Sequence, residues 1–112
     1  MDTKRQEKVN RLLQKELAEI FRVDMQPYFP GIMFTVTYVN VTSDLSLARV
    51  NLSMFPVKDK DSVIKQVKEH TSEIRLKLGR KIKNQLRIVP QLQFFADETL
   101  DRAQRIEELL QQ

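Results

Sequence analysis

Two short runs of alternating apolar and polar residues are the feature that most limits the fold of this chain. In residues 34–39 the alternate apolar side chains are Phe34, Val36 and Tyr38, and in residues 48–54 they are Ala48, Val50, Leu52 and Met54. A period of two in runs rich in β-branched residues predicts strands. Thr42, Ser43 and Asp44 offer the side-chain acceptors of a tight turn, so we expect an antiparallel hairpin that ends before Pro56.

Helical spacing flanks this hairpin on both sides. Residues 3–23 place Val9, Leu12, Leu13, Leu17, Ile20 and Phe21 on one apolar face, and residues 61–86 do the same with Val63, Val67, Ile74, Leu78 and Ile82. In the middle of the second segment, His70-Thr71-Ser72 are weak helix formers, which favours two shorter helices meeting at a kink. Asp61 or Ser62 is available as the first cap, and Gly79 either relieves close packing or marks another bend.

The remaining elements are a third strand and a last helix. Residues 86–96 read as a strand in which Pro90 indicates an edge position or a bulge, and residues 97–112 read as an amphipathic helix capped by Asp97 or Thr99. With only three strands, the helices must cover one face of the sheet to make a core. The sequence therefore predicts one domain over residues 1–112, an α+β fold of two layers with Val36, Val50, Leu78, Leu92 and Phe94 in its core.

The residues that most chemistry requires are scarce. The chain has no cysteine, one histidine and two glycines, and neither glycine lies in a phosphate-binding pattern. The carboxylate pairs Asp97-Glu98 and Glu107-Glu108 fit helix capping and a solvated face. We therefore expect no enzyme, no catalytic residue, no metal site and no cofactor. No apolar run is long enough to span a bilayer and the N-terminus lacks a signal-peptide pattern, which predicts a cytoplasmic protein.

Positive charge is concentrated in the stretch IRLKLGRKIKNQLR, residues 74–87. It holds six of the 19 basic residues and no acidic one, so the rest of the chain has 13 basic against 15 acidic residues. A second basic line, comprising Lys4, Lys8, Arg11, Lys15 and Arg22, falls within an arc of roughly 60° opposite the apolar stripe of residues 3–23. Each line alone could be an ordinary solvated face. Together they favour contact with the phosphates of a nucleic acid.

Several motifs resemble one known family. The run VTYVNVTSDLSLARVNLS, residues 36–53, resembles the signature of ribosome-binding factor A, in which a Ser-x-Asp-Leu turn joins a valine-rich strand to an Ala-basic-Val strand. Residues 87–94, RIVPQLQF, resemble the Arg-x-x-Pro-Glu-Leu-x-Phe strand of that family. Arg5, Lys8 and Val9 resemble its basic first helix, and Ile74, Arg75 and Leu78 resemble a later one.

The resemblance implies a type II KH-like fold of order α-β-β-α-α-β, here followed by a short C-terminal helix over residues 97–112. Two places depart from the family pattern. The Ala-x-Gly kink between the two later helices falls on His70-Thr71-Ser72, so both its Ala and its Gly are missing. Gln26-Pro27-Tyr28 stands where the family often has Asp-Pro-Arg.

The function implied is a non-enzymatic assembly factor that binds the immature small (30S) ribosomal subunit and 16S rRNA, aids rRNA processing and late maturation, and supports growth in the cold. We expect a monomer without membrane or small-molecule partners. The alternative is a protein-interaction module whose basic faces are only solvated. The expected RNA-binding residues are Lys4, Arg5, Lys8, Arg11, Lys15, His70, Thr71, Ser72, Arg75, Lys77, Arg80, Lys81, Lys83 and Arg87.

Overall fold

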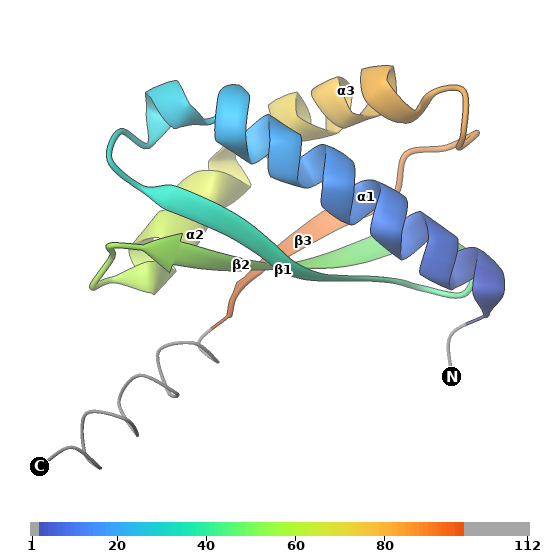
Figure 1. Ribbon diagram of the computed structural model, residues 1–112, viewed down its shortest axis with the longest axis horizontal. Coiled ribbons are helices and arrows are strands. Elements are labelled where there is room, and N and C mark those ends of the chain that lie inside the picture. The colour runs from blue at the N-terminus through green and yellow to red at the C-terminus, as the bar shows by residue number, and fades with distance from the viewer. Residues whose placement is uncertain (1–2, 98–112) are drawn as a thin grey trace, which may run out of the picture.

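The computed structural model describes residues 3–97, which form one α+β unit (Figure 1). The elements are α1 (Lys4–Val23), the 3-10 helix η1 (Gln26–Tyr28), β1 (Met33–Val41), β2 (Leu47–Phe55), α2 (Lys60–Glu69), α3 (Thr71–Ile82) and β3 (Gln91–Ala96). Apart from η1, this order is the α-β-β-α-α-β expected of a type II KH-like fold. The expected C-terminal helix lies, except for Asp97, outside the described residues.

The hairpin is confirmed as antiparallel, and its turn is held by one carboxylate. Asp44 Oδ1 accepts hydrogen bonds from the Thr42 hydroxyl at 2.7 Å, the Ser46 hydroxyl at 2.7 Å and the Ser46 backbone N–H at 3.1 Å. Leu45 takes a positive φ of 61°, which a leucine rarely adopts, and its N–H donates to the Thr42 carbonyl. The hydrogen bonds from Ser46 and Thr42 lower the pKa of Asp44 to about 2.

The lowered pKa of Asp44 in this turn predicts that the stability of the protein depends on pH. Because the pKa of Asp44 is lower in the folded chain than in an unfolded one, its contribution is complete above about pH 4 and is lost as the pH falls towards 2. We expect the native protein to be more stable than the Asp44→Asn variant at pH 6, and this difference to shrink between pH 4 and pH 2. Urea unfolding of both proteins at several pH values measures it, and a constant difference would contradict the assignment.

The sheet has the order β1-β2-β3, with β3 parallel to β2. The third strand begins at Gln91, so the prediction that it starts at Leu86 was wrong by five residues. Pro90 has no N–H to donate to a ladder, and the preceding residues form a loop that returns from the end of α3. Pro90 therefore stands directly before a strand at the edge of the described sheet.

The first helix is confirmed almost to the residue. Thr3 caps it, with the Thr3 hydroxyl and the Gln6 side chain forming reciprocal hydrogen bonds to each other's backbone N–H. Three amide side chains at four-residue spacing face the outer edge of β1. Gln6 donates to the Val41 carbonyl, Asn10 accepts from the Val41 N–H and Gln14 donates to the Val36 carbonyl. The edge of β1 is thus bonded to α1 at these points.

The kink in the second helical segment is also confirmed, because α2 and α3 meet at His70. Two details of the prediction were wrong. The cap of α2 is Asp59 rather than Asp61 or Ser62, and its side chain accepts a hydrogen bond from the Ser62 N–H. The second helix, α3, ends at Ile82 rather than at Leu86, and the N–H groups of Gln85 and Leu86 donate to the Ile82 carbonyl. Gly79 lies inside α3, and a Cβ there would come within 3.1 Å of Val89, so close packing explains it.

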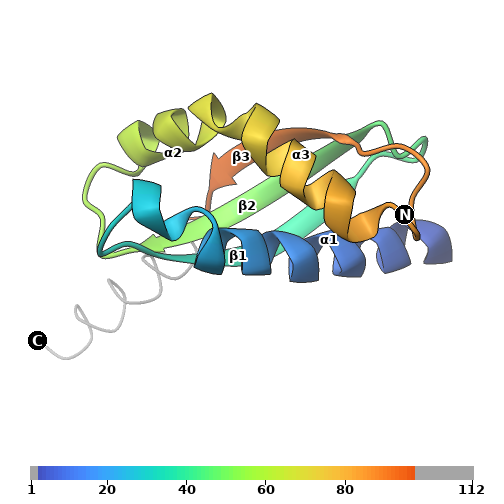
Figure 2. The same ribbon diagram turned by 90° about the horizontal axis from the view of Figure 1, so that it is seen from above.

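All three helices pack on one face of the sheet (Figures 1 and 2). The five residues expected in the core, Val36, Val50, Leu78, Leu92 and Phe94, are all buried. Phe94 packs its ring edge-on to Phe21 of α1 at 6.0 Å. On the other face of the sheet, side chains of all three strands remain exposed. The molecule therefore has two different outer surfaces, which are the helical layer on one side and the open face of the sheet on the other.

Candidate nucleic-acid interface

The basic line of α1 lies on the solvent side of the helix. Lys4, Arg5, Lys8, Arg11 and Lys15 are all exposed, and none of them forms an ion pair with another described residue. They project there because Leu13, Leu17 and Ile20 hold the opposite face of α1 in the core. Arg22, at the end of the line, differs from them. It pairs with Glu19 through two hydrogen bonds, the shorter 2.6 Å, and these bonds lower the pKa of Glu19.

The basic residues of α3 divide into paired and unpaired ones. Lys77 Nζ lies 3.3 Å from Asp24 Oδ1, and Lys81 Nζ lies 3.8 Å from Glu16 Oε2. The hollow between α1 and α3 is lined by Lys77, Lys81 and Asp24 together with Glu19 and Arg80, so it carries both signs of charge. A phosphate gains little from such a mixed surface. Lys77 and Lys81 therefore join the two helices and are weaker candidates for phosphate contact than the sequence suggested.

Arg75 has a structural partner as well. Its guanidinium donates to the Val89 carbonyl at 2.9 Å and to the Pro90 carbonyl at 3.1 Å. These two bonds fix the loop between α3 and β3 immediately before the strand begins. Arg75 thus helps to set the start of β3.

We expect Arg75→Ala to lower the free energy of unfolding by about 1–3 kcal/mol, since two hydrogen bonds from a charged donor are lost. Arg75→Lys keeps the charge but loses the planar fork of donors, so it should fall between Ala and the native protein. Urea unfolding of the three proteins measures this order. A Lys variant as stable as the native protein would show that the charge, and not the pair of hydrogen bonds, is what matters.

Arg80, Lys83 and Arg87 remain exposed and form no ion pair with another described residue. The two ion pairs show that α3 runs antiparallel to α1, because Lys77 meets Asp24 and Lys81 meets the earlier Glu16. The end of α3 therefore approaches the N-terminal half of α1 (Figure 2). We call the unpaired basic residues of the N-terminal half of α1 and of the segment directly after α3 the basic end: Lys4, Arg5, Lys8, Arg11, Lys83 and Arg87. Lys15 and Arg80 extend it along the helices.

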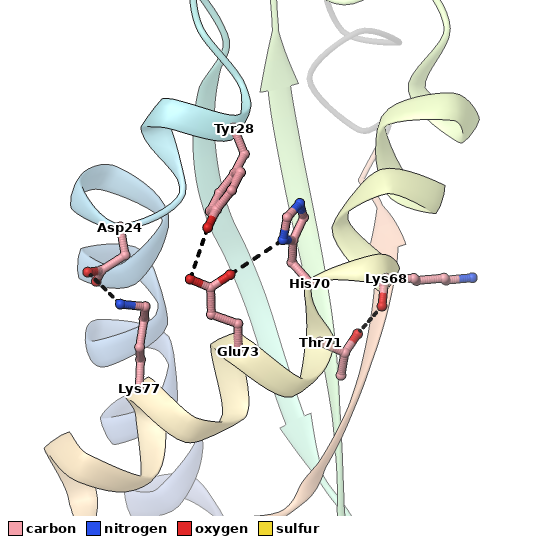
Figure 3. Close-up of polar contacts among 7 residues, drawn as sticks. All are labelled: Asp24, Tyr28, Lys68, His70, Thr71, Glu73 and Lys77. Carbon is pink, nitrogen blue, oxygen red and sulfur yellow. Dashed lines mark hydrogen bonds and ion pairs between the residues drawn. The ribbon is translucent and has the colours of Figure 1, made fainter.

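The break between α2 and α3 needs no glycine. His70 has a φ of −98° and a ψ of 10°, and neither Thr71 nor Ser72 has a positive φ. The Thr71 hydroxyl donates to the Lys68 carbonyl at 2.7 Å (Figure 3). Ser72 is exposed. An L side chain accommodates this geometry without strain. The chain can therefore make the kink without the family's Ala and Gly.

The two departures from the family pattern touch each other. The ring of Tyr28 lies 4.2 Å from that of His70, and both side chains meet Glu73 (Figure 3). The Tyr28 hydroxyl donates to Glu73 Oε1 at 3.2 Å, and His70 Nδ1 lies 3.5 Å from Glu73 Oε2. Sequence reasoning treated the two sites separately. The fact that both sites depart from the family pattern was the available signal that Tyr28 contacts the kink. His70 is half-buried there.

The described residues hold no group of three or more metal-ligating side chains, and none of their helices is both long and apolar enough to cross a bilayer. Of the carboxylate pairs considered, only Asp97 is described, and it accepts a hydrogen bond from the Thr37 hydroxyl. The candidate site is the charged surface formed by the basic residues of α1, of α3 and of the segment after α3.

Comparison with known proteins identifies the family. A family model described as ribosome-binding factor A matches residues 5–110 of the chain. The chain belongs to the ribosome-binding factor A family. The ribosome-binding factor A of Cytophaga hutchinsonii is 37% identical over 110 residues, which cover 98% of this chain and 83% of that protein. That of Prosthecochloris aestuarii is 40% identical over 106 residues, or 94% and 85% of the two chains. The predicted family is confirmed.

Solved structures of ribosome-binding factor A share the fold. The crystal structure from Thermus thermophilus superposes with a TM-score of 0.68 at 20% identity, over 81% of this chain and 94% of that one. A homology model of the Thermus thermophilus factor, fitted into a cryo-EM map of a 30S complex, gives 0.64 at 20% identity, over 79% and 90%. Together with the observed order of elements, this confirms the KH-like fold.

Proposed function

We propose that the protein is a non-enzymatic assembly factor that binds the immature small (30S) ribosomal subunit and contacts 16S rRNA. In this role it aids rRNA processing and late maturation. Family membership supports the class of function, and the Thermus thermophilus relative fitted into a 30S complex supports the partner. The observation that carries the proposal is the basic end. Its basic side chains, which have no ion-pair partner among the described residues, come from α1 and from the segment that follows α3.

Phosphates suit the basic end better than other anions do. A nucleic acid that meets Lys8, Arg11 and Lys83 releases condensed counterions, which favours binding without any base-specific contact. The protein then needs no active site, because it stabilises the rRNA arrangement to which it binds most tightly. We also propose that the protein is a monomer, that it acts in the cytoplasm, and that residues 1–112 form a single RNA-binding domain. In this role it supports growth in the cold.

Co-sedimentation with mature and immature small subunits over a salt series tests this function. Each phosphate contact should steepen the fall of log affinity with log salt by about 0.7–0.9, so we expect a steep decline and a preference for immature particles. Affinity that does not change with salt would support the alternative, in which the protein binds a ribosomal protein and its basic faces are only solvated. Equal binding to both particles would contradict a role in assembly.

A further inference from the structure

The uncovered face of the sheet carries two ordered rows of side chains. Residues paired across neighbouring strands project from the same face of a sheet. One row consists of Tyr38, Asn51 and Phe95, and the next of Asn40, Arg49 and Gln93. These rows face away from the core because the residues between them, Val39, Val50 and Phe94, are buried beneath the helices. Asn51 thus stands between two aromatic rings.

Both rings are open to solvent. Tyr38 is 52% exposed and Phe95 is 44% exposed, and neither packs against another described aromatic ring. The position of Tyr38 depends on the bulge in β1, where the pairing shifts between Val36 and Tyr38 and turns Tyr38 to the open face. Exposed aromatic rings held at fixed positions on a sheet can serve as stacking platforms for bases.

The surroundings of the rings indicate the kind of ligand. The adjoining row offers two carboxamides and the guanidinium of Arg49, which forms no ion pair with another described residue, and neither row contains a carboxylate. The Asp97 carboxylate borders the first row, where it accepts a hydrogen bond from the Thr37 hydroxyl. On the other side, Thr35 and Ser53 separate the rings from the apolar pair Met33 and Phe55. Exposed rings among hydrogen-bonding side chains suit nucleobases, which offer both a face for stacking and polar edges.

The spacing also fits a single strand. Tyr38 and Phe95 are two strands apart, which places their backbones about 10 Å from each other. Each ring can then stack on a different base of one extended strand, while Asn51 and Gln93 reach base edges and Arg49 reaches a phosphate. A duplex could not use the rings in this way, because its base faces are already stacked.

We propose that this open sheet face, built on Tyr38, Asn51, Phe95 and Arg49, binds single-stranded RNA by base stacking. It lies on the side of the sheet opposite the helices, and it borders the basic line of α1 at the edge of β1, where Arg11 and Lys15 line one hollow with Met33 and Thr35. One surface of the protein would then hold backbone phosphates, and the other would hold unpaired nucleotides. The second surface does not depend on small-subunit binding, since its ligand is any accessible single strand.

The test uses the full-length protein and a fluorescein-labelled single-stranded RNA hexamer of mixed sequence, with binding followed by anisotropy. Tyr38→Leu and Phe95→Leu keep an apolar side chain but remove the ring face, and each should weaken binding roughly tenfold. Tyr38→Phe keeps the ring and should bind like the native protein. Leu76→Ser removes an exposed apolar residue from α3 and is the matched control. Unchanged binding by both Leu variants would overturn the proposal.

Amide spectra of the ¹⁵N-labelled protein locate the ligand. The hexamer should shift the signals of Asn51 and its neighbours on the open face. Shifts confined to α1 and α3, or equally tight binding of a matching RNA duplex, would mean phosphate contact only and would overturn the proposal. Open-face signals that change when residues 98–112 are deleted, or that change with protein concentration without RNA, would assign the face to the chain's own end or to a second copy, which also overturns it.

The outcome is independent of the proposed function. Variants of the basic end should lose small-subunit binding while their open-face signals still respond to the hexamer. Leu variants at Tyr38 and Phe95 should lose the hexamer even if subunit binding through the basic end persists. Failure of one proposal therefore leaves the other standing.

Discussion

Phe94→Ala is expected to lower the free energy of unfolding by about 3–5 kcal/mol, which is enough to unfold many domains of this size. Phe94 is 1% exposed on the helix-covered face of the sheet and meets Phe21 of α1 edge-on. Its removal leaves a cavity between the sheet and the first helix, which neither layer can close without moving. Urea unfolding followed by circular dichroism measures the loss.

The neighbouring residue provides the control for this prediction. Phe95 has the same side chain on the same strand but faces solvent, so Phe95→Ala should cost no more than about 1 kcal/mol. Similar losses for the two variants would mean that the face assignment of β3 is wrong.

Removing three charges from the basic end should produce the largest functional effect. We expect Lys8→Ala, Arg11→Ala and Lys83→Ala together to weaken small-subunit binding at least about tenfold and to reduce its salt slope by about 2–3. The thermal midpoint should hardly change, because the three side chains are exposed and form no ion pair within the described chain. Sedimentation at several salt concentrations gives both quantities.

A triple variant of equal charge serves as the control. Lys58, Lys65 and Lys68 are exposed in and before α2, away from the basic end, and their replacement by Ala removes the same charge. If this variant weakens binding as much as the first, the net charge of the protein is responsible, and the basic end is not the site.

Local periodicity was sufficient to predict most of the fold. The alternation in residues 34–39 and 48–54 predicted the hairpin, and the weak helix formers at His70 predicted the break between α2 and α3. The start of β3 was missed because it depends on Arg75, which lies 14 residues before Val89 and bonds to its carbonyl. Such a contact leaves no periodic signal in a sequence.

The sequence predicted where the basic residues lie, but it did not predict which of them form ion pairs. A count of basic residues located both lines, yet it could not show that Lys77 and Lys81 meet Asp24 and Glu16, since those partners lie more than 50 residues away in the chain. The open sheet face was harder still. Tyr38 reaches it only because a bulge at Thr37 shifts the alternation, and simple counting from Val36 places Tyr38 in the core.

The amides of α1 along β1 bear on how the protein behaves in a crowded cell. An exposed strand edge is a template on which another chain can add a strand and begin to aggregate. Here Gln6, Asn10 and Gln14 occupy backbone groups of that edge, so a second molecule would have to displace the helix first. The β1 edge is therefore a poor template for strand addition, whereas β3 forms the other edge of the described sheet.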